Sequence, residues 1–394
     1  MNDPRAVWRV AFVVAVAQLG FATVIPLLPL HLTEHLGASV KLVGVVIATF
    51  ALVETFFKTA WGGVADRLGR KPVMVVGLTL SAIAPLVMAV LRAPILFVPL
   101  RVVDGMGSAA LWPAAAAAVA DATTPDRRAT GMSLLNVAFL GGVAAGPSLG
   151  LFAAGFAGDA RAGFYLASAL LLLAAMLSLT LVSTGHGAPD PPGAYHGDVR
   201  TTYLSALAGS LRGSPALLSL YVVAFVQMFG VGMLVPIAAI YAKQVVGLSE
   251  HAIGAVFLVV VGAVAVATIP AGRLADRTGK PALVKMGMIA GAMGMWLIPI
   301  SGRLSGLMLA GLLLGIGYAL LFPAWLALIS EMAPPGRLGL AIGASETTQG
   351  LGLVLGPLLG GFLWDAAGPR APFVASAAAI TVGAMLAMVT LRRR

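Results

Sequence analysis

Long apolar runs separated by short polar turns dominate the hydropathy pattern of the chain. Twelve of these runs have the length that a membrane-spanning helix needs, about 20 residues. They lie near residues 7–31, 42–64, 73–91, 94–120, 129–154, 162–183, 215–242, 250–272, 282–301, 304–331, 339–364 and 371–391. The pattern therefore predicts an all-α membrane protein with twelve transmembrane helices.

One polar turn occurs twice. The stretch GGVADRLGRKP follows the run at 42–64, and AGRLADRTGKP follows the run at 250–272. An offset of 210 residues relates the two copies, so that Asp66 recurs as Asp276 and Gly69 as Gly279. A fixed offset of this kind indicates a duplicated unit.

The same offset relates glycines and prolines elsewhere in the chain. The pairs are Gly20 and Gly230, Pro26 and Pro236, Gly105 and Gly315, Gly107 and Gly317, Pro113 and Pro323, Gly142 and Gly352, Gly146 and Gly356, Pro147 and Pro357, and Gly150 and Gly360. Two parallel repeats predict two pseudo-symmetric six-helix halves, with a substrate path between them near the bilayer midplane. We assign the halves to residues 1–183 and 215–394, and the Pro- and Gly-rich segment 184–214 to a cytoplasmic linker.

Composition supports the membrane class. Hydrophobic residues make up 59% of the chain and charged residues 10%, whereas soluble domains have about 45–50% apolar and about 25% charged residues. The 48 glycines suit close helix packing in lipid. Because cysteine is absent, disulfides and thiolate metal sites are excluded.

The net charge of +10 raises the question of a nucleic-acid partner. The positive residues instead lie in short loops between apolar runs: 16 fall on the side of the N-terminus, 6 on the other side and 3 within spans, which accounts for all 25. This positive-inside pattern predicts that both termini are cytoplasmic and excludes nucleic acid. The run at 7–31 is too long for a signal peptide and is expected to be retained.

Several motifs resemble those of one transporter family. Both polar turns resemble the loop signature of the major facilitator superfamily. The stretch Gly142–Gly150 resembles the G-x-x-x-G-P-x-x-G signature that accompanies its antiporters, and Leu19–Pro29 resembles a pattern of its twelve-helix drug:proton antiporters. Arg101–Ala109 resembles R-x-x-Q-G-x-G, with Asp104 in place of glutamine. The resemblance implies the major facilitator fold and an antiporter of the multidrug type.

The antiporter motif also has a direct physical interpretation. Gly142, Gly146 and Gly150 repeat every four residues and form a groove along one helix face, while Pro147 permits a bend. These four residues are expected to form a close, slightly flexible contact between helices. A simple packing groove is the alternative.

The polar turns are predicted to form a cytoplasmic gate. Asp66 is expected to face the positive N-terminus of a neighbouring helix, the span at 339–364, and Arg70 is expected to pair with Asp121. In the second half Lys280 and Glu331 repeat this pair. The predicted gate residues are Gly62, Asp66, Arg67, Gly69, Arg70, Lys71, Asp121, Asp276, Arg277, Lys280 and Glu331. The alternative is an anchor that only fixes the topology.

Charges inside the spans suggest proton coupling. Ionisable groups near the bilayer centre are costly unless they are paired or wet. Glu54 lies four residues from Lys58, and Arg101 lies three residues from Asp104, so each pair shares a helix face. We predict Glu54, Arg101, Asp104 and Glu346 as proton-coupling residues and leave the carrier open among the three acids. A static ion pair is the alternative for each pair.

The substrate is only weakly encoded. Candidates for the cavity are aromatic, amide and methionine side chains within spans, namely Gln18, Phe21, Trp112, Asn136, Gln227, Met233, Tyr318, Phe322, Trp325 and Gln349. Aromatic and methionine side chains with few polar groups suit an amphipathic organic molecule. Ordinary helix packing is the alternative for each of them.

These features predict a proton-driven efflux antiporter for amphipathic or lipophilic small molecules in a bacterial-type cytoplasmic membrane. We expect a monomer whose partners are its small-molecule substrate, protons and the lipid bilayer, with no cofactor or metal. The alternatives are a transporter of similar fold for a sugar, a lipid or a metal-chelating metabolite, or a membrane sensor without transport. An enzyme is not expected, because the sequence contains no metal cluster, activated nucleophile or phosphate loop.

Overall fold

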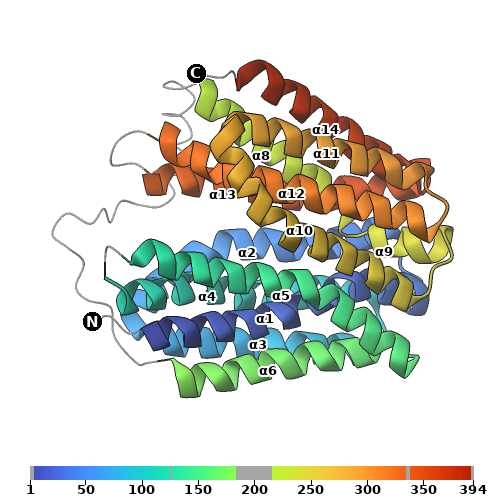
Figure 1. Cartoon of the computed structure of the whole chain (residues 1–394). Helices are drawn as coiled ribbons and strands as arrows, with labels where there is room; N and C mark the ends of the chain where they lie inside the picture. Colours follow the sequence, from blue (N-terminus) through green and yellow to red (C-terminus); the bar gives the residue numbers. More distant parts are fainter. Residues whose placement is uncertain (1–3, 125–126, 183–214, 334–337, 392–394) are drawn as a thin grey trace. The chain divides into compact units, whose positions relative to one another are not determined.

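The structure, a computed structural model, describes residues 4–124, 127–182, 215–333 and 338–391. Every regular element in these ranges is helical (Figure 1). The elements are α1 Pro4–Leu30, η1 His31–His35, α2 Val40–Leu68, α3 Arg70–Val90, η2 Pro94–Leu96, α4 Phe97–Ala122, α5 Arg128–Ala157, α6 Arg161–Leu181, α8 Pro215–Leu234, α9 Ala238–Ile240, η3 Tyr241–Val245, α10 Glu250–Thr278, α11 Lys280–Ile300, α12 Leu304–Met332, α13 Leu338–Ala367 and α14 Ala371–Thr390.

The described helices confirm the predicted membrane architecture. Among them, 12 are long and apolar enough to cross a bilayer. Many large apolar side chains on these helices are exposed, such as Phe56 on α2 and Val266 on α10. Exposed apolar surface of this extent is expected where lipid rather than water surrounds the helices. The chain is a multi-pass membrane protein.

The chain folds into two compact units. Unit 1 comprises Met1–Ala38, Thr49–Tyr195 and Ser249–Gly254, and unit 2 comprises Ser39–Ala48, His196–Leu248 and Ala255–Arg394. Within unit 1, α1 lies beside both α5 and α6 (Figure 1). Within unit 2, α8 lies beside α13 and α14 in the same way.

Two short segments belong to a different unit from the rest of their helix. The start of α2 lies in unit 2, where the Lys41 backbone N–H donates to Asp365 Oδ2 at 2.9 Å. The start of α10 lies in unit 1, where Ser148 Oγ donates to the Gly254 carbonyl at 3.0 Å. The units therefore differ from the halves 1–183 and 215–394 at these segments. The linker 184–214 lies outside the described residues, so its boundaries stay a prediction.

Glycines of α5 bring it into backbone contact with α1. A Cβ added at Gly142 would lie 2.6 Å from the Ala15 carbonyl oxygen, and one at Gly146 would lie 2.5 Å from the Ala22 Cβ. Real side chains do not fit at such distances, so both positions require glycine. The predicted groove on this helix is therefore a closely packed seam.

Unit 2 contains the same seam between α8 and α13. A Cβ at Gly356 would lie 2.5 Å from the Phe229 carbonyl oxygen, and one at Gly360 would lie 2.7 Å from the Met233 carbonyl oxygen. Phe229 and Met233 correspond, at the 210-residue offset, to Leu19 and Thr23 of α1. The repeat found in the sequence thus recurs as repeated packing.

One predicted span is interrupted. The run at 215–242 was expected to be one continuous helix, but α8 ends at Leu234 and a turn at residues 235–237 precedes the short elements α9 and η3. Pro236 lies in this turn. Proline has no backbone N–H and its ring blocks the preceding turn of helix, which gives a physical reason for the break. The prediction of an unbroken span was wrong here.

Candidate functional site

A buried ion pair lies on α4 of unit 1. Arg101 and Asp104 are three residues apart on the helix, and Arg101 Nη1 contacts Asp104 Oδ2 at 2.5 Å. Only 8% of Arg101 and 3% of Asp104 is exposed. The Arg101 guanidinium also lies 4.4 Å from the centroid of the Phe50 ring, a cation–π distance. Both predicted charges are therefore held inside the unit.

One atom of this ion pair lacks a hydrogen-bond partner, although a neighbouring serine bonds to the same turn of helix. Ser81 Oγ on α3 donates to the backbone carbonyl of Asp104 at 3.1 Å. Arg101 Nε is buried and has no hydrogen-bond partner within the described residues. A buried polar atom without a partner costs free energy, so the guanidinium retains a donor that another group or a water could use.

A second ion pair lies nearby on α2. Lys58 Nζ contacts Glu54 at 3.1 Å, and the two side chains are 41% and 28% exposed. The residues next to the two acids are in contact, since a Cβ at Gly105 would lie 3.0 Å from the Val53 Cβ. The sequence prediction that each pair shares a helix face is confirmed. Unit 1 thus has two neighbouring acids, each paired with its own base.

The polar turn between α2 and α3 forms a three-residue cluster. Gly69 has a φ of 94°, which side chains rarely adopt, and this turn starts α3 at Arg70. Arg70 Nη1 contacts Asp66 at 2.5 Å and Arg70 Nε contacts Asp121 at 3.1 Å. The predicted pair of Arg70 with Asp121 is confirmed. The predicted contact of Asp66 with the start of the span at 339–364 stays a prediction.

The corresponding turn of unit 2 has the same backbone but a simpler pairing. Gly279 has a φ of 86°, and the Lys280 ammonium contacts the Glu331 carboxylate, as predicted. The side chain of Asp276 lies outside the part of the chain that the structure describes. The arginines that follow each aspartate, Arg67 and Arg277, are exposed.

Most of the candidate cavity residues are partly exposed, whereas two are buried. Trp112 on α4 packs edge-on against Phe139 at 5.1 Å between ring centroids, and both are partly exposed. Along α12, the rings of Tyr318 and Phe322 stack at 5.3 Å. The other cavity candidates that are partly exposed are Gln18, Phe21, Asn136, Gln227 and Gln349. Of the remaining predicted site residues, Glu346 is exposed and Gly62 is partly exposed.

Two cavity candidates are interior packing residues in this structure. Met233 is 1% exposed and its backbone lies in the α8–α13 seam. Trp325 is 5% exposed, and its Nε1 donates to the Leu220 carbonyl at 3.4 Å. Both side chains fill space inside unit 2. This burial argues against a cavity role for either residue.

Sequence reasoning overlooked a buried histidine. His31 begins the π-helical turn η1 and is 3% exposed, and neither ring nitrogen has a hydrogen-bond partner within the described residues. Its ring stacks on His35 at 5.2 Å. In the sequence, the i, i+4 spacing of His31 and His35 at the end of an apolar run is the signal that points to this pair. No group of three potential metal ligands occurs among the described residues.

Comparison with known proteins identifies the family. The model of the Major Facilitator Superfamily matches residues 10–226 and again residues 220–394. The chain therefore belongs to the major facilitator superfamily. Its two matched segments agree with the repeat seen in the sequence and in the glycine seams.

Individual relatives narrow the class. The chain is 27% identical over 376 residues to "Multidrug resistance protein 2" of Bacillus subtilis, covering 95% of this chain and 92% of that protein. It is 26% identical over 383 residues to the multi-drug resistance efflux pump PmrA of Streptococcus pneumoniae, covering 94% and 92%. A crystal structure of the nucleoside transporter NupG shares the fold with a TM-score of 0.82 at 14% identity, covering 98% of this chain and 100% of that one. The family and these relatives indicate a membrane transporter with a small-molecule substrate.

Proposed function

We propose that this chain is a proton-coupled antiporter that exports amphipathic or lipophilic small molecules by alternating access. The observation that carries the proposal is the buried Arg101–Asp104 pair beside Glu54 and Lys58. Relatives named for multidrug resistance and efflux support the choice of cargo class and the export direction.

The proposed coupling uses the chemistry of a buried carboxylate. A carboxylate in an apolar interior is stable as one partner of an ion pair or as the neutral acid, but not as an isolated charge. Asp104 is the most buried of the three candidate acids, and Arg101 is its partner. We propose that movement of α4 separates the pair and that a proton then replaces the guanidinium. Glu54 and Glu346 remain the other candidate carriers.

The proposed gate is the cluster of Arg70 with Asp66 and Asp121, together with Lys280 and Glu331. In this proposal both termini are cytoplasmic, so the two clusters lie on the cytoplasmic side. Exchange of these ion pairs between closed and open states would allow alternating access. Asp66→Asn is expected to lower turnover while leaving folding and membrane insertion intact; turnover at the wild-type rate would remove the gating role.

The test of coupling is transport by purified protein in proteoliposomes. An imposed pH gradient should drive accumulation of some members of a panel of cationic and neutral amphipathic compounds. Counterflow, which needs no gradient, is measured beside it for wild type, Asp104→Asn, Glu54→Gln and Glu346→Gln. Loss of gradient-driven transport with preserved counterflow would identify the acid that carries the proton.

Two results would contradict the proposal. If all three acid variants still concentrate cargo against its gradient, proton antiport through these carboxylates is excluded. If Asp104→Asn is poorly folded and the double variant Arg101→Gln/Asp104→Asn restores folding, the pair is a static structural element, because removing one partner leaves the other charge buried and unpaired.

A further inference from the structure

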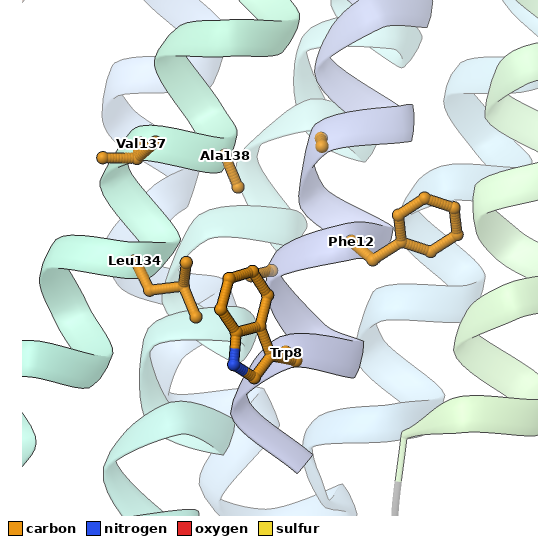
Figure 2. A pocket seen from close by; sticks show the side chains of 7 residues that line it. Trp8, Phe12, Leu134, Val137 and Ala138 are labelled. Carbon is orange, nitrogen blue, oxygen red and sulfur yellow. The ribbon is translucent and has the colours of Figure 1, made fainter. Parts of the chain in front are cut away.

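An apolar groove runs along the surface of unit 1 between α1 and α5. Its lining is Trp8, Ala11, Phe12, Ala15, Leu134, Val137 and Ala138, and its volume is about 210 Å³. The indole of Trp8 lies beside Leu134, with Ala138 and Val137 further along α5 (Figure 2). No polar atom contributes to the lining surface. The groove is smaller than the about 300–1,000 Å³ of sites that enclose drug-sized ligands.

The groove continues the glycine seam toward the N-terminus of α1. Gly142 and Gly146 hold the two helices in backbone contact. Val137 and Leu134, about one turn and two turns earlier on α5, line the groove together with Trp8. Trp8 is 64% exposed and Val137 is 67% exposed, so the groove opens at the surface of the unit.

Basic residues border the end of the groove. On α1, Arg5, Trp8, Arg9 and Phe12 are all exposed, while Val10 between them is buried. Their spacing of three and four residues places them on one helix face. Arg9 is three residues from Phe12, which is about 4.5 Å along the helix axis. A positive charge therefore lies within a side-chain length of the apolar lining.

The start of α5 adds further positive charge at the same level. A Cβ at Gly131 would lie 3.6 Å from Val7 Cγ1, which aligns this part of α5 with the first residues of α1. Arg127 and Arg128, which lie just before Gly131, are exposed. Arg9 on α1 and Arg127 and Arg128 at the start of α5 thus lie toward the Trp8 end of the groove.

We infer that this groove binds one anionic phospholipid, with an acyl chain along Trp8 and the phosphate beside Arg9 and Arg128. The volume suits a segment of one chain, and the arginines complement an anionic headgroup. Basic residues at the membrane surface attract anionic lipids, and tryptophan favours the boundary between chains and headgroups. With the orientation proposed above, the lipid belongs to the inner leaflet. This inference does not depend on which cargo is transported or on proton coupling.

Quenching of Trp8 fluorescence by brominated lipid tests the inference directly. The purified full chain is placed in phosphatidylcholine vesicles that contain a few mole per cent of brominated phosphatidylglycerol or, in parallel, of brominated phosphatidylcholine. The contribution of Trp8 is the difference between wild type and Trp8→Phe. Phosphatidylglycerol is expected to quench this contribution at least threefold more strongly than phosphatidylcholine at equal mole fraction.

Two variants separate the headgroup from the chain. Arg9→Gln/Arg128→Gln should abolish the preference for phosphatidylglycerol, whereas Arg92→Gln/Arg303→Gln, which changes exposed arginines at the opposite helix ends, should keep it. Ala138→Phe should fill the groove and reduce quenching by both lipids. Ala157→Phe, at an exposed position near the end of the same helix, is its matched control.

Equal quenching by the two lipids at wild type would overturn the inference, because ordinary lipid contact has no headgroup preference. Absence of quenching by either lipid would also overturn it and would indicate that protein, such as a second copy of the chain, covers the groove. A preference that survives Arg9→Gln/Arg128→Gln would place the headgroup site elsewhere. None of these quenching measurements requires the protein to transport a cargo.

Discussion

The two units share their packing but differ in their chemistry. Glycines of α5 and α13 meet α1 and α8 at corresponding positions, and both polar turns have a glycine with positive φ. The two ion pairs within helices of unit 1, Arg101–Asp104 and Glu54–Lys58, have no such counterpart among the described residues. At the 210-residue offset, Arg101 and Asp104 correspond to Gly311 and Leu314, and Glu54 and Lys58 correspond to Val264 and Thr268.

The difference indicates which features the duplicated fold itself needs. Helix contacts at backbone distance leave no room for variation, so the glycines persist in both units. A charge on a helix face is not required to close the same contact, since Gly311 packs against Val260 where Arg101 lies over Phe50. The packing of the duplicated fold therefore does not require the charges of unit 1, which supports the role in coupling proposed above.

The largest effect should come from breaking what the units share. Gly146→Leu and Gly356→Leu should both impair assembly, because each places a branched side chain where backbone atoms already lie at 2.5 to 2.7 Å. Overpacking of this kind costs about 1–3 kcal/mol or more. The yield of monodisperse protein and its thermal unfolding measure the loss. Gly141→Leu is the control, since nothing lies near that position and unit 2 has Leu351 there; normal behaviour of Gly146→Leu would disprove the seam.

The next effect should come from giving unit 1 the apolar chemistry of unit 2. In Arg101→Met/Asp104→Leu both charges are removed together, so no unpaired charge is left in the interior. The variant should fold and show counterflow, but its pH-driven accumulation should fall at least tenfold. Leu314→Met on α12 is the matched control and should transport normally. Unchanged accumulation by the double variant would show that the charge asymmetry has no role in coupling.

A smaller effect is expected at corresponding aromatic positions of the two units. Phe322, which corresponds to Trp112 in unit 1, stacks with Tyr318 on α12. Aromatic contacts contribute about 0.5–1.5 kcal/mol, so Phe322→Ala should raise the apparent KM for cargo about twofold to tenfold with little change in maximal rate. Phe362→Ala, an exposed aromatic on α13, is the control. Equal KM values for Phe322→Ala and wild type would remove Phe322 from the cargo site.

The smallest effect is expected from exchanging the bases of the two polar turns. Arg70 contacts two carboxylates, whereas Lys280 contacts the carboxylate of Glu331. Lysine lacks the planar fork of arginine, so Arg70→Lys should lose one contact. Arg70 itself is buried, but both of its carboxylate partners are exposed to solvent. Because solvent weakens such pairs to about 0.2–1 kcal/mol, turnover should fall less than about fivefold. Lys280→Arg should leave turnover unchanged. If Lys280→Arg lowers turnover more than Arg70→Lys does, the turn of unit 1 is not the more sensitive of the two.

The sequence by itself determined the membrane class, the twelve spans and the duplication. Continuous apolar runs leave helices as the available membrane-spanning form for such a chain, because every backbone polar group must be bonded internally in lipid. The i, i+3 and i, i+4 spacing also determined the pairs at Arg101 and Glu54, since helical geometry alone brings those side chains together. The partner of Arg70 was predicted as Asp121 because both residues lie at the cytoplasmic ends of their spans, and Lys280 and Glu331 repeat this arrangement.

Tertiary structure decided the features that depend on neighbouring helices. Periodicity cannot distinguish a side chain that faces a cavity from one that faces another helix, so Met233 and Trp325 were assigned to a cavity although both are buried in unit 2. The break after Leu234 also depends on context, because Pro26 at the corresponding position stays within α1. The groove at Trp8 is lined by side chains of both α1 and α5, so only the packing of the two helices creates that space.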